Sequence, residues 1–356
     1  VVHQFIISSP EPFMRTAVVL LALAAAARFV ASQPRLSEVY GQVYAEVGDP
    51  GNAPYVYEPI PGVTPPRSIG AVDRRYRIAV TEVTETQWAE FANAITPFLT
   101  NNEYFNSDFA PTLRIGGFSN GRPVFQATPG DENYPAVMGW RWASRYCNWL
   151  HNGKALTAEA FQSGAYDTST FGTEIGEFGF TEYTDQSTRS TGATFWIPSE
   201  DEWVKAAFYD PNKNGEGQGG YWRYAGMSDD PLVTAPPGMG GETNAGGEHY
   251  DGPGEVPFDV GSYPNAASYY GLLDTSGGRS EWTETWSSPL FERERLALGS
   301  DYFIRPDFLE MIEPIGWLGA GSPDGATHGL RLATSIPAPC TLGALLVNTL
   351  MARRRR

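Results

Sequence analysis

Residues 271–283 constrain the fold of this chain most strongly, because they combine a glycine turn with fixed acidic positions. They read Gly-Leu-Leu-Asp-Thr-Ser-Gly-Gly-Arg-Ser-Glu-Trp-Thr, with the turn at Gly277 and Gly278. Asp274 and Glu281 flank this turn and enclose several backbone carbonyls. Calcium binds such mixtures of carboxylate and carbonyl oxygens. The segment therefore predicts either a calcium loop or a plain glycine turn whose carboxylates face water.

The chain is strongly acidic, and this limits its partners. Its 356 residues carry a formal net charge of −16, with 41% hydrophobic and 13% aromatic residues. That hydrophobic content can build a substantial core, whereas the negative surface disfavours nucleic acid and anionic lipids. The two cysteines, Cys147 and Cys340, are too few for a disulfide framework. We therefore expect a domain stabilised by its core or by bound metal, with no nucleic-acid partner.

The N-terminal part of the sequence is typical of an export signal behind a short extension. A positive charge and an apolar run at residues 17–27 follow Met14, and small residues precede a cleavage position at Gln33. We therefore predict a signal peptide at residues 14–32. Residues 1–13 precede Met14, and we interpret them as a non-native extension of the reading frame.

The C-terminal residues 336–356 have three parts. Pro337-Ala-Pro339 precedes an apolar stretch that reaches Ala352, and arginines end the sequence. The apolar stretch is shorter than the ~20 residues that span a bilayer, and the basic cluster favours the cytoplasmic side. The arrangement resembles the PEP-CTERM sorting signal of exported bacterial proteins, with Ala338 in place of the central glutamate. The resemblance implies recognition by a membrane-bound sorting protease and a cell-surface or extracellular location. The alternative is a plain C-terminal anchor.

Two segments carry complete signals for the start of a helix. Thr84 and Gln87 are spaced as the two members of a capping box, and Ser199 and Glu202 repeat that spacing. Apolar residues then recur at helical spacing after each box. A further helix is predicted over about residues 140–150, from a stripe of apolar residues that ends before an Asn-Gly pair.

The rest of the sequence predicts short strands and long loops in one α+β domain. Richness in Pro and Gly predicts an irregular lead-in at residues 33–70, followed by the domain itself at residues 71–335. Strands are predicted at residues 72–80, 269–273, 282–286 and 328–334. Loops with short strands or hairpins are predicted at residues 98–134, 154–192 and 212–265.

Several blocks of the sequence follow an order that is typical of one known family. The blocks are Glu82-Val-Thr84 with Trp88 and Phe91, Tyr134-Pro-Ala-Val137 with Tyr146-Cys-Asn-Trp-Leu150, Ile197-Pro-Ser-Glu-Asp-Glu-Trp203, residues 271–282, and His328-Gly-Leu-Arg331. Together they resemble the formylglycine-generating enzyme (sulfatase-modifying factor) domain family. The resemblance implies the α+β fold of that family, a C-type-lectin-like variant with few helices, short strands and long loops. Residues 198–211 and the tail are similar to the exported, PEP-CTERM-tailed members.

The resemblance implies a copper-dependent oxidation that this chain cannot perform by the family's route. Members that form formylglycine hold copper with two cysteines, because soft thiolates suit Cu(I). The corresponding residues 298–306 contain no cysteine. Cys147 matches a structural position of the family on a helix face, which predicts a buried, inert thiol. We therefore predict neither copper nor catalytic residues.

Iron is not expected either. Mononuclear iron takes two or three histidines and keeps open positions. The mature chain offers His151, His249 and His328, which lie in three separate blocks.

The resemblance implies two calcium sites. The first uses Asp274, the carbonyls of Gly277 and Arg279, and Glu281. The second uses Asn244, the carbonyl of Ala245, Asp251 and the carbonyl of Pro253. A cation that binds only the folded state would stabilise these long loops by mass action.

These observations leave three functions open. The first is an exported, surface-sorted binding or scaffold module, stabilised by calcium, with an unidentified protein, peptide or glycan ligand. Tyr221, Trp222 and Tyr224 either line a groove for such a ligand or pack into the core. The second is an oxidoreductase of the formylglycine-generating or nonheme-metal type with different ligands. The third, a carbohydrate-binding lectin-like domain, rests on fold analogy alone.

Overall fold

The computed structural model describes residues 34–57, 67–100, 103–176, 179, 181–246, 258–286, 294–301, 312, 320–323, 325 and 328–337. The chain divides into two compact units, Val1–Arg35 and Leu36–Arg356, and the elements below belong to the second. The predicted extension 1–13, the signal segment 14–32 and the tail from residue 338 onward lie outside the described residues. Within the described part of the chain, no helix is both long and apolar enough to cross a membrane.

Helices are few and strands are short in the described residues. The α-helices are α2 (Glu85–Ile95), α3 (Trp140–His151), α4 (Ala158–Gln162) and α5 (Glu200–Phe208). Short 3-10 helices lie at Thr96–Phe98, Glu103–Phe105, Thr168–Thr170 and Pro237–Met239. The strands are β1 (Leu36–Val39), β2 (Gln42–Val47), β3 (Tyr55–Tyr57), β4 (Arg67–Ile69), β5 (Tyr76–Ala79), β6 (Arg114–Ser119), β7 (Arg122–Gln126), β8 (Thr173–Ile175), β9 (Thr181–Tyr183), β10 (Phe195–Trp196), β11 (Tyr209–Asp210), β12 (Gly220–Tyr221), β13 (Glu281–Trp286), β14 (Arg295–Leu298), β15 (Ala320–Gly321) and β16 (Ala333–Thr334). This inventory confirms the predicted α+β class with long loops.

The largest sheet joins segments from both ends of the domain. Its strands follow the order β1-β2-β5-β16-β10, and every neighbouring pair is antiparallel. Ile78 of β5 lies opposite Ala45 of β2 on one side and Ala333 of β16 on the other. A smaller sheet has the order β13-β14-β15. The pairing of β5 with β16 brings residues far apart in sequence to one end of the domain.

The predicted irregular lead-in at residues 33–70 is wrong, because β1 pairs with β2 and β3 pairs with β4 in this range. Strands β1 and β2 form a hairpin around Tyr40 and Gly41, whose φ angles are 53° and 78°. Two consecutive left-handed residues suit the tight turn of a hairpin. The prolines and glycines around β2 predicted irregular structure. The segment is nevertheless a strand, because β5 pairs with it.

The predicted helix starts are confirmed. The side chain of Thr84 accepts from the backbone N–H of Gln87, and Gln87 accepts from the N–H of Thr84. Ser199 and Glu202 form the same reciprocal box at the start of α5. Each box satisfies backbone donors that the first helical turn would leave unpaired.

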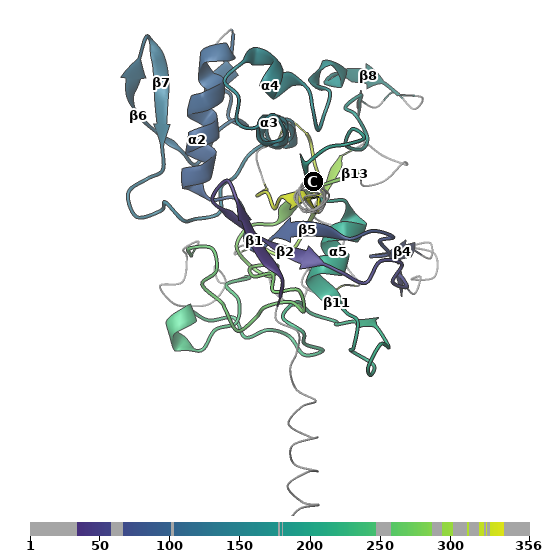
Figure 1. The fold of residues 1–356 in the computed structure, drawn as a ribbon. Helices are drawn as coiled ribbons and strands as arrows, with labels where there is room; N and C mark the ends of the chain where they lie inside the picture. Colours follow the sequence, from purple (N-terminus) through teal and green to yellow (C-terminus); the bar gives the residue numbers. More distant parts are fainter. Residues whose placement is uncertain are drawn as a thin grey trace, which may run out of the picture. The chain divides into compact units, whose positions relative to one another are not determined.

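An aromatic core forms where α2 and α3 lie side by side (Figure 1). The ring of Phe91 in α2 lies 5.2 Å from that of Tyr146 and 5.8 Å from that of Trp149, both in α3. Most tryptophans of the sequence blocks are buried, namely Trp88, Trp140, Trp142, Trp149, Trp196, Trp203 and Trp282. These tryptophans therefore contribute to the core rather than to an exposed surface.

The strand predicted at residues 269–273 is wrong. This segment makes a single backbone bond to β5's end, from Leu273 N–H to the carbonyl of Val80 at 2.8 Å, instead of a ladder. Asp274 then adopts left-handed φ, which ends an extended path. The strand predicted at residues 282–286 is confirmed as β13.

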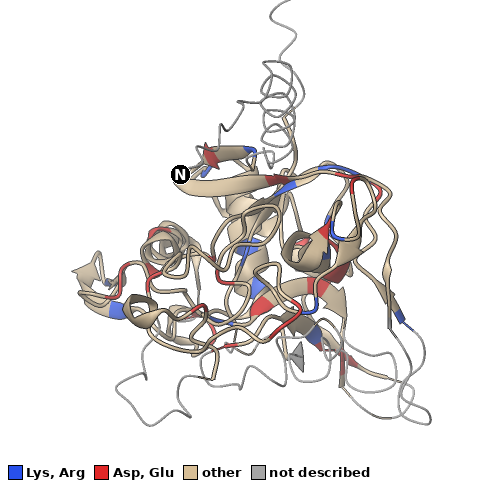
Figure 2. Cartoon of the chain, turned by 90° about the horizontal axis from the view of Figure 1, so that it is seen from below, with Lys and Arg blue, Asp and Glu red and all other residues tan. Residues whose placement is uncertain are grey.

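The long segments between helices contain the hairpins that composition predicts. The β6–β7 hairpin lies within residues 98–134, and the β8–β9 hairpin lies within residues 154–192. The short helix α4 in the second segment was not predicted, and its N-cap is Thr157. Figure 2 shows acidic and basic residues interspersed over the described part of the chain.

Candidate cation site

The predicted first calcium loop is packed tightly between two other segments. Its backbone is left-handed at Asp274, Gly277 and Gly278, with φ of 57°, 84° and 65°. A Cβ on Gly277 would overlap the side-chain oxygen of Asn244. A Cβ on Gly278 would overlap Oε1 of Glu82. Both positions therefore need glycine, for the backbone angle and for the close approach.

Asp274 opens the loop and is anchored on a neighbouring segment. Its Oδ2 accepts a hydrogen bond from the backbone N–H of Gly261 at 2.5 Å. Burial raises the pKa of this carboxyl to about 6, although that hydrogen bond and the charge of Arg331 act in the opposite direction. Burial therefore disfavours the ionised form of Asp274.

Glu281, the first residue of β13, is the buried partner of Arg331. Its Oε1 accepts from Nη2 of Arg331 at 2.6 Å, and its Oε2 accepts from Nε of Arg331 at 2.8 Å. Nε1 of Trp203 donates to the same Oε2 at 2.5 Å. Arg331 also donates to three backbone carbonyls, those of Ala79, Val80 and Leu273. This bidentate pair ties β13 to the end of β5 and to the entry of the loop.

Glu82, the first residue of the block Glu82-Val-Thr84, is a member of this site that the sequence analysis did not predict as a site residue. Its side chain is 0% exposed, and its Oε1 accepts from the backbone N–H of Arg279 at 2.9 Å. Its Oε2 is buried and has no hydrogen-bond partner among the described residues. Burial raises the pKa of Glu82 well above its usual range, and the charges of Asp274 and Glu281 raise it further. The sequence signal that could have indicated Glu82 is its position as an acidic residue directly before the apolar Val83 and the capping Thr84.

Together, Glu82, Asp274, Glu281 and Arg331 form what we term the acid-rich cluster. It contains three carboxyl groups and one guanidinium, so its ionised form carries excess negative charge. Burying uncompensated charge is costly, and either protons or a cation must offset it. Among the residues that the structure describes, no three His, Cys, Asp or Glu side chains are grouped so as to hold a metal ion. An ion at this loop would therefore need backbone carbonyls as well.

The structure brings part of the predicted second calcium site against the first. The Asn244 side-chain oxygen accepts from the backbone N–H of Gly278 at 2.8 Å. The hydroxyl of Ser276 donates a hydrogen bond to the hydroxyl of Thr243 at 2.9 Å. Ala245, the next predicted ligand, is buried. The segment with Asn244 therefore supports the turn of the first loop. The other predicted ligands, Asp251 and Pro253, lie outside the described residues.

The groups considered for redox metals have separate surroundings. Nδ1 of His151 lies 2.9 Å from Oγ1 of Thr194, whereas Nδ1 of His328 lies 2.6 Å from Oγ of Ser280. Burial lowers the pKa of His328 to about 4. Cys147 is buried, and burial raises the pKa of its thiol well above the usual range. His249 and most of the stretch 298–306 lie outside the described residues.

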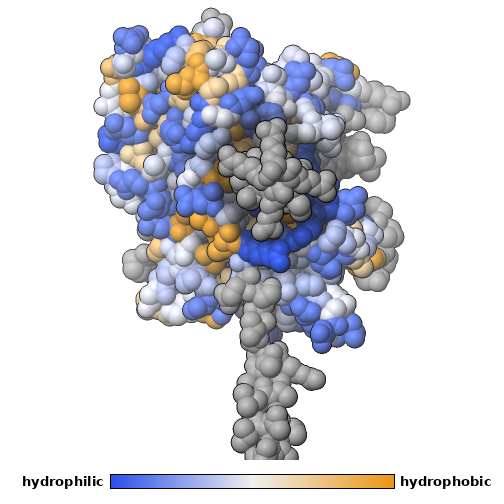
Figure 3. Space-filling model, viewed as in Figure 1, coloured by the Kyte–Doolittle hydropathy of each residue, from blue (hydrophilic) through white to orange (hydrophobic). Residues whose placement is uncertain are grey.

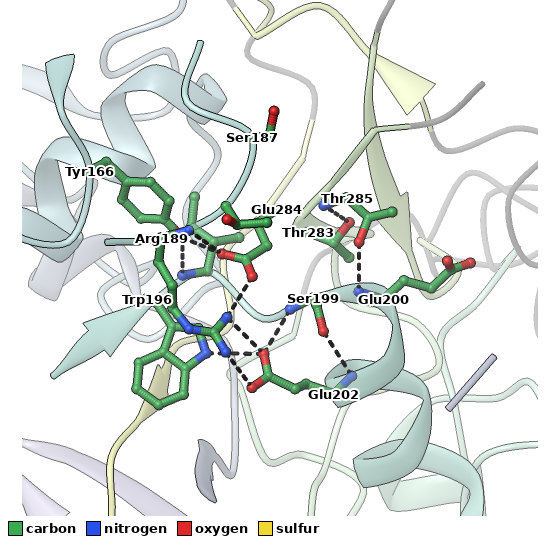
Figure 4. Close-up of polar contacts among 12 residues, drawn as sticks. Tyr166, Ser187, Arg189, Trp196, Ser199, Glu200, Glu202, Thr283, Glu284 and Thr285 are labelled. Atoms are coloured by element: carbon green, nitrogen blue, oxygen red, sulfur yellow. Dashed lines mark hydrogen bonds and ion pairs between the residues drawn. The ribbon is translucent and has the colours of Figure 1, made fainter. Parts of the chain in front are cut away.

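A second group of charges has equal numbers of acids and bases, and we term it the balanced cluster. It consists of the buried Glu202 and Glu284, of Arg189, and of the half-exposed Arg74. Arg189 lies between the two carboxylates (Figure 4) and donates to Glu284 Oε1 at 2.5 Å and to Glu202 Oε1 at 2.9 Å. Arg74 donates to Oε1 of Glu202 at 2.5 Å. Neutral donors fill the remaining positions, namely Trp196, Ser199 and Tyr166. Both carboxylates in this cluster are therefore fully hydrogen-bonded.

The tyrosines and tryptophan considered for a ligand groove are engaged within the protein. Tyr224 is 4% exposed. The Tyr221 hydroxyl donates to the carbonyl of Gly70 at 2.8 Å. The amine of Lys213 lies 4.4 Å from the ring centroid of Trp222. These contacts favour packing over a shared groove.

The fold and the loop geometry define a loop-rich α+β domain of the sulfatase-modifying type. The family model for the sulfatase-modifying factor enzyme 1-like domain (FGE-sulfatase) matches residues 41–336, so the chain belongs to this family. The predicted family resemblance is thereby confirmed. The comparison with curated proteins found no match.

Solved structures with similar folds have low sequence identity to this chain. Treponema denticola variable protein 1 is 17% identical with a TM-score of 0.49, and the match covers 85% of this chain and 99% of that chain. A structure titled CarF is 18% identical with a TM-score of 0.44, covering 83% of this chain and 98% of that chain.

Proposed function

We propose that this chain is an exported, surface-sorted member of the family that acts as a calcium-stabilised binding or scaffold module without the copper chemistry. The observation that carries the proposal is the excess of buried carboxylates in the acid-rich cluster. A divalent cation would offset that charge while leaving the carboxylates ionised.

In this proposal the first calcium ion is held by loop 274–281. Asp274 and Glu281 supply carboxylate oxygens, and Gly277 and Arg279 supply carbonyl oxygens. The second ion uses Asn244, Ala245, Asp251 and Pro253. Binding to the native state alone at a hundred times the Kd would add about 2.7 kcal/mol to the free energy of unfolding. Calcium thus acts as an internal crosslink for loops with little regular structure.

The cysteine content supports a role other than thiolate-copper oxidation. No cysteine lies between Cys147 and Cys340. The buried thiol of Cys147 is held in its neutral form, which is neither a good metal ligand nor a nucleophile.

Metal analysis and one activity assay test this proposal together. We expect purified protein to contain calcium, without stoichiometric copper or iron, and to leave a cysteinyl peptide unmodified under air. Stoichiometric copper or iron that is lost in His328→Ala or His249→Ala would favour the oxidoreductase. Conversion of the peptide cysteine to its aldehyde would contradict the proposal directly.

The binding role rests on exposed apolar side chains that the fold does not use. Phe118 and Ile115 of the β6–β7 hairpin are 66% and 42% exposed, and Phe105 is 58% exposed. Apolar patches lie among polar side chains on the face shown in Figure 3. Such groups can contact a protein, peptide or glycan. A pull-down that compares the wild type with Phe118→Ser would test for a protein or peptide ligand. A glycan array would test for a glycan.

The proposal of export and sorting rests on the sequence alone. The signal segment 14–32 would direct export, and residues 336–356 would be recognised by a membrane-bound sorting protease. We expect deletion of residues 336–356 to move the protein from the cell surface into the medium. An unchanged distribution would contradict a sorting tail.

A further inference from the structure

We propose that Arg145 of α3 binds a carboxylate of an acidic peptide, either an Asp or Glu side chain or a free C-terminus. The inference rests on the proposed binding role and deepens it, because it names the chemistry of one ligand and the residue that binds it. The observation behind it is a partly exposed guanidinium that makes ring contacts but has no oxygen acceptor among the described residues.

Aromatic rings hold the guanidinium of Arg145. Its central carbon lies 4.9 Å from the ring centroid of Trp142 and 5.5 Å from that of Phe171. Burial lowers the pKa of Arg145, although the charge of Glu103 opposes that shift. A guanidinium carries five N–H donors, and contact with an aromatic ring gives them no oxygen acceptor. The group is therefore partly dehydrated and positioned, and its donors are available.

Arg141, one helical turn earlier in α3, shows what Arg145 lacks. Its central carbon lies 5.3 Å from the same Phe171 ring, so the two cations share an aromatic neighbour. Arg141 donates to both oxygens of Asp185, at 2.7 and 3.0 Å, and to the carbonyl of Gly172 at 2.8 Å. Such a two-bond pair is the strong form of arginine–carboxylate contact. A carboxylate from a ligand would give Arg145 the partner that Asp185 gives Arg141.

The two carboxylates whose charges act on Arg145 are engaged with other donors. Oε2 of Glu103 accepts from the backbone N–H of Thr100 at 2.9 Å. Oδ2 of Asp108 accepts from Nε1 of Trp142 at 3.0 Å. Both charges favour the charged form of Arg145, but neither group forms an ion pair with it within the described ranges. A carboxylate from outside therefore displaces no internal partner.

Shape and charge favour a carboxylate on a ligand of low total charge. The planar guanidinium fork matches the two oxygens of a carboxylate. The net charge of −16 opposes ligands that carry many negative charges. Phe171 and Tyr183 lie beside Arg141 and are partly exposed, so they offer apolar contacts to the residues that flank a carboxylate in a peptide. Arginine among aromatic rings is also typical of the strongest positions in protein interfaces.

A peptide array with matched acid and amide members tests the inference on the full chain. Each peptide with Asp, Glu or a free C-terminus is paired with its Asn, Gln or C-terminal amide counterpart. We expect the wild type to bind acidic members and to bind their amide counterparts about tenfold or more weakly, because the amide lacks the charge that the guanidinium pairs with. Equal binding of acid and amide members would overturn the inference.

Fluorescence polarisation of the strongest array peptide with three variants assigns the effect to one residue. We expect Arg145→Gln to weaken binding about tenfold or more, because the charged donors are lost. Arg145→Lys keeps the charge without the planar fork and should recover only part of the affinity; it serves if the glutamine variant does not fold. Arg114→Gln removes the same charge from an exposed position of β6 and should bind as the wild type does. Wild-type affinity in either Arg145 variant would overturn the inference.

The same measurements separate this inference from the proposed function. If the wild type and Arg145→Gln bind peptides equally well, the binding module stands and only the role of Arg145 fails. If uronate-bearing glycans bind and peptides do not, the peptide assignment is wrong, while the binding role stands. If neither peptides nor glycans bind, the proposed binding role fails, and the inference fails with it.

Discussion

The acid-rich cluster and the balanced cluster lie in the same domain but differ in how far their carboxylates are paired with bases and hydrogen-bond donors. In the balanced cluster, Arg189 and Arg74 neutralise Glu202 and Glu284, and each carboxylate oxygen has a donor. Arg74 and Glu202 also line a cavity of about 410 Å³. This network is complete as it stands, and we interpret it as structural.

The acid-rich cluster is incomplete by the same measures. Its single base, Arg331, is committed to Glu281, and Oε2 of Glu82 has no donor among the described residues. Glu82 is 0% exposed, so bulk water does not screen it. The comparison teaches that the stability of a buried cluster depends less on the number of its charges than on whether each charge has a partner. Under the proposed function, the loop near Gly277 is the place where a cation would add most to the stability of the fold.

The largest expected effect comes from removing the only base of the acid-rich cluster. Arg331→Met leaves Glu281 buried without its partner and should lower the free energy of unfolding by about 3–5 kcal/mol. Calcium should restore part of this loss, because it offsets the same charges. Denaturation in calcium and in chelator measures both quantities. An equal loss in both conditions would contradict a cation at this cluster.

Arg189→Met is the matched change in the balanced cluster. It leaves Glu284 without its base and should cost about 3 kcal/mol, since Arg74 still pairs with Glu202. Calcium should have no effect on this loss. Recovery of stability in calcium would remove the distinction between the two clusters.

Asp274→Asn tests the loop itself with little disturbance of its backbone, because asparagine tolerates left-handed φ. We expect the calcium-dependent stabilisation, about 2.7 kcal/mol at a hundred times the Kd, to disappear. In chelator the variant should be at least as stable as the wild type, because a buried carboxylate has been neutralised. A wild-type response to calcium would remove Asp274 from the ligand set.

The balanced cluster should respond to pH through Glu284. Burial raises the pKa of this carboxyl from its ordinary 4.5 to about 7, although Arg189 opposes the shift. The native state then binds the proton more tightly than the unfolded chain, so this contribution is present below about pH 4.5 and is lost as the pH rises to about 7. Relative to Glu284→Gln, the wild type should lose roughly 2 kcal/mol between pH 5 and 8. A difference that stays constant over this range would show that Glu284 titrates normally.

The smallest expected effect is local to α5. Ser199→Ala removes the side-chain acceptor of the capping box and should cost about 1 kcal/mol, whatever the calcium concentration. Thermal denaturation measures this change. No change would mean that the backbone N–H of Glu202 finds another acceptor.

Sequence reasoning succeeded where the controlling contacts are local. Thr84 with Gln87 and Ser199 with Glu202 are three residues apart, so their capping boxes could be read directly. Gly277 and Gly278 likewise marked a turn that the structure contains. These features depend on short-range stereochemistry, which the sequence specifies.

The misses arose where a partner lies far along the chain. Glu82 and Arg279 are separated by 197 positions, so the burial of Glu82 against the loop had no local signal. The pairing of Glu281 with Arg331 likewise joins different sequence blocks. Strand β2 was missed because it pairs with β5, about thirty positions further on, and β1 pairs in turn with β2. In each case tertiary contacts decided the outcome.

The most direct test of the cation at the acid-rich cluster is the melting temperature of the wild-type protein in saturating calcium and in excess chelator. The account predicts a clearly higher melting temperature in calcium, since a bound cation would offset the negative charge of this cluster that Arg331 alone does not balance. The same melting temperature in both conditions would contradict it.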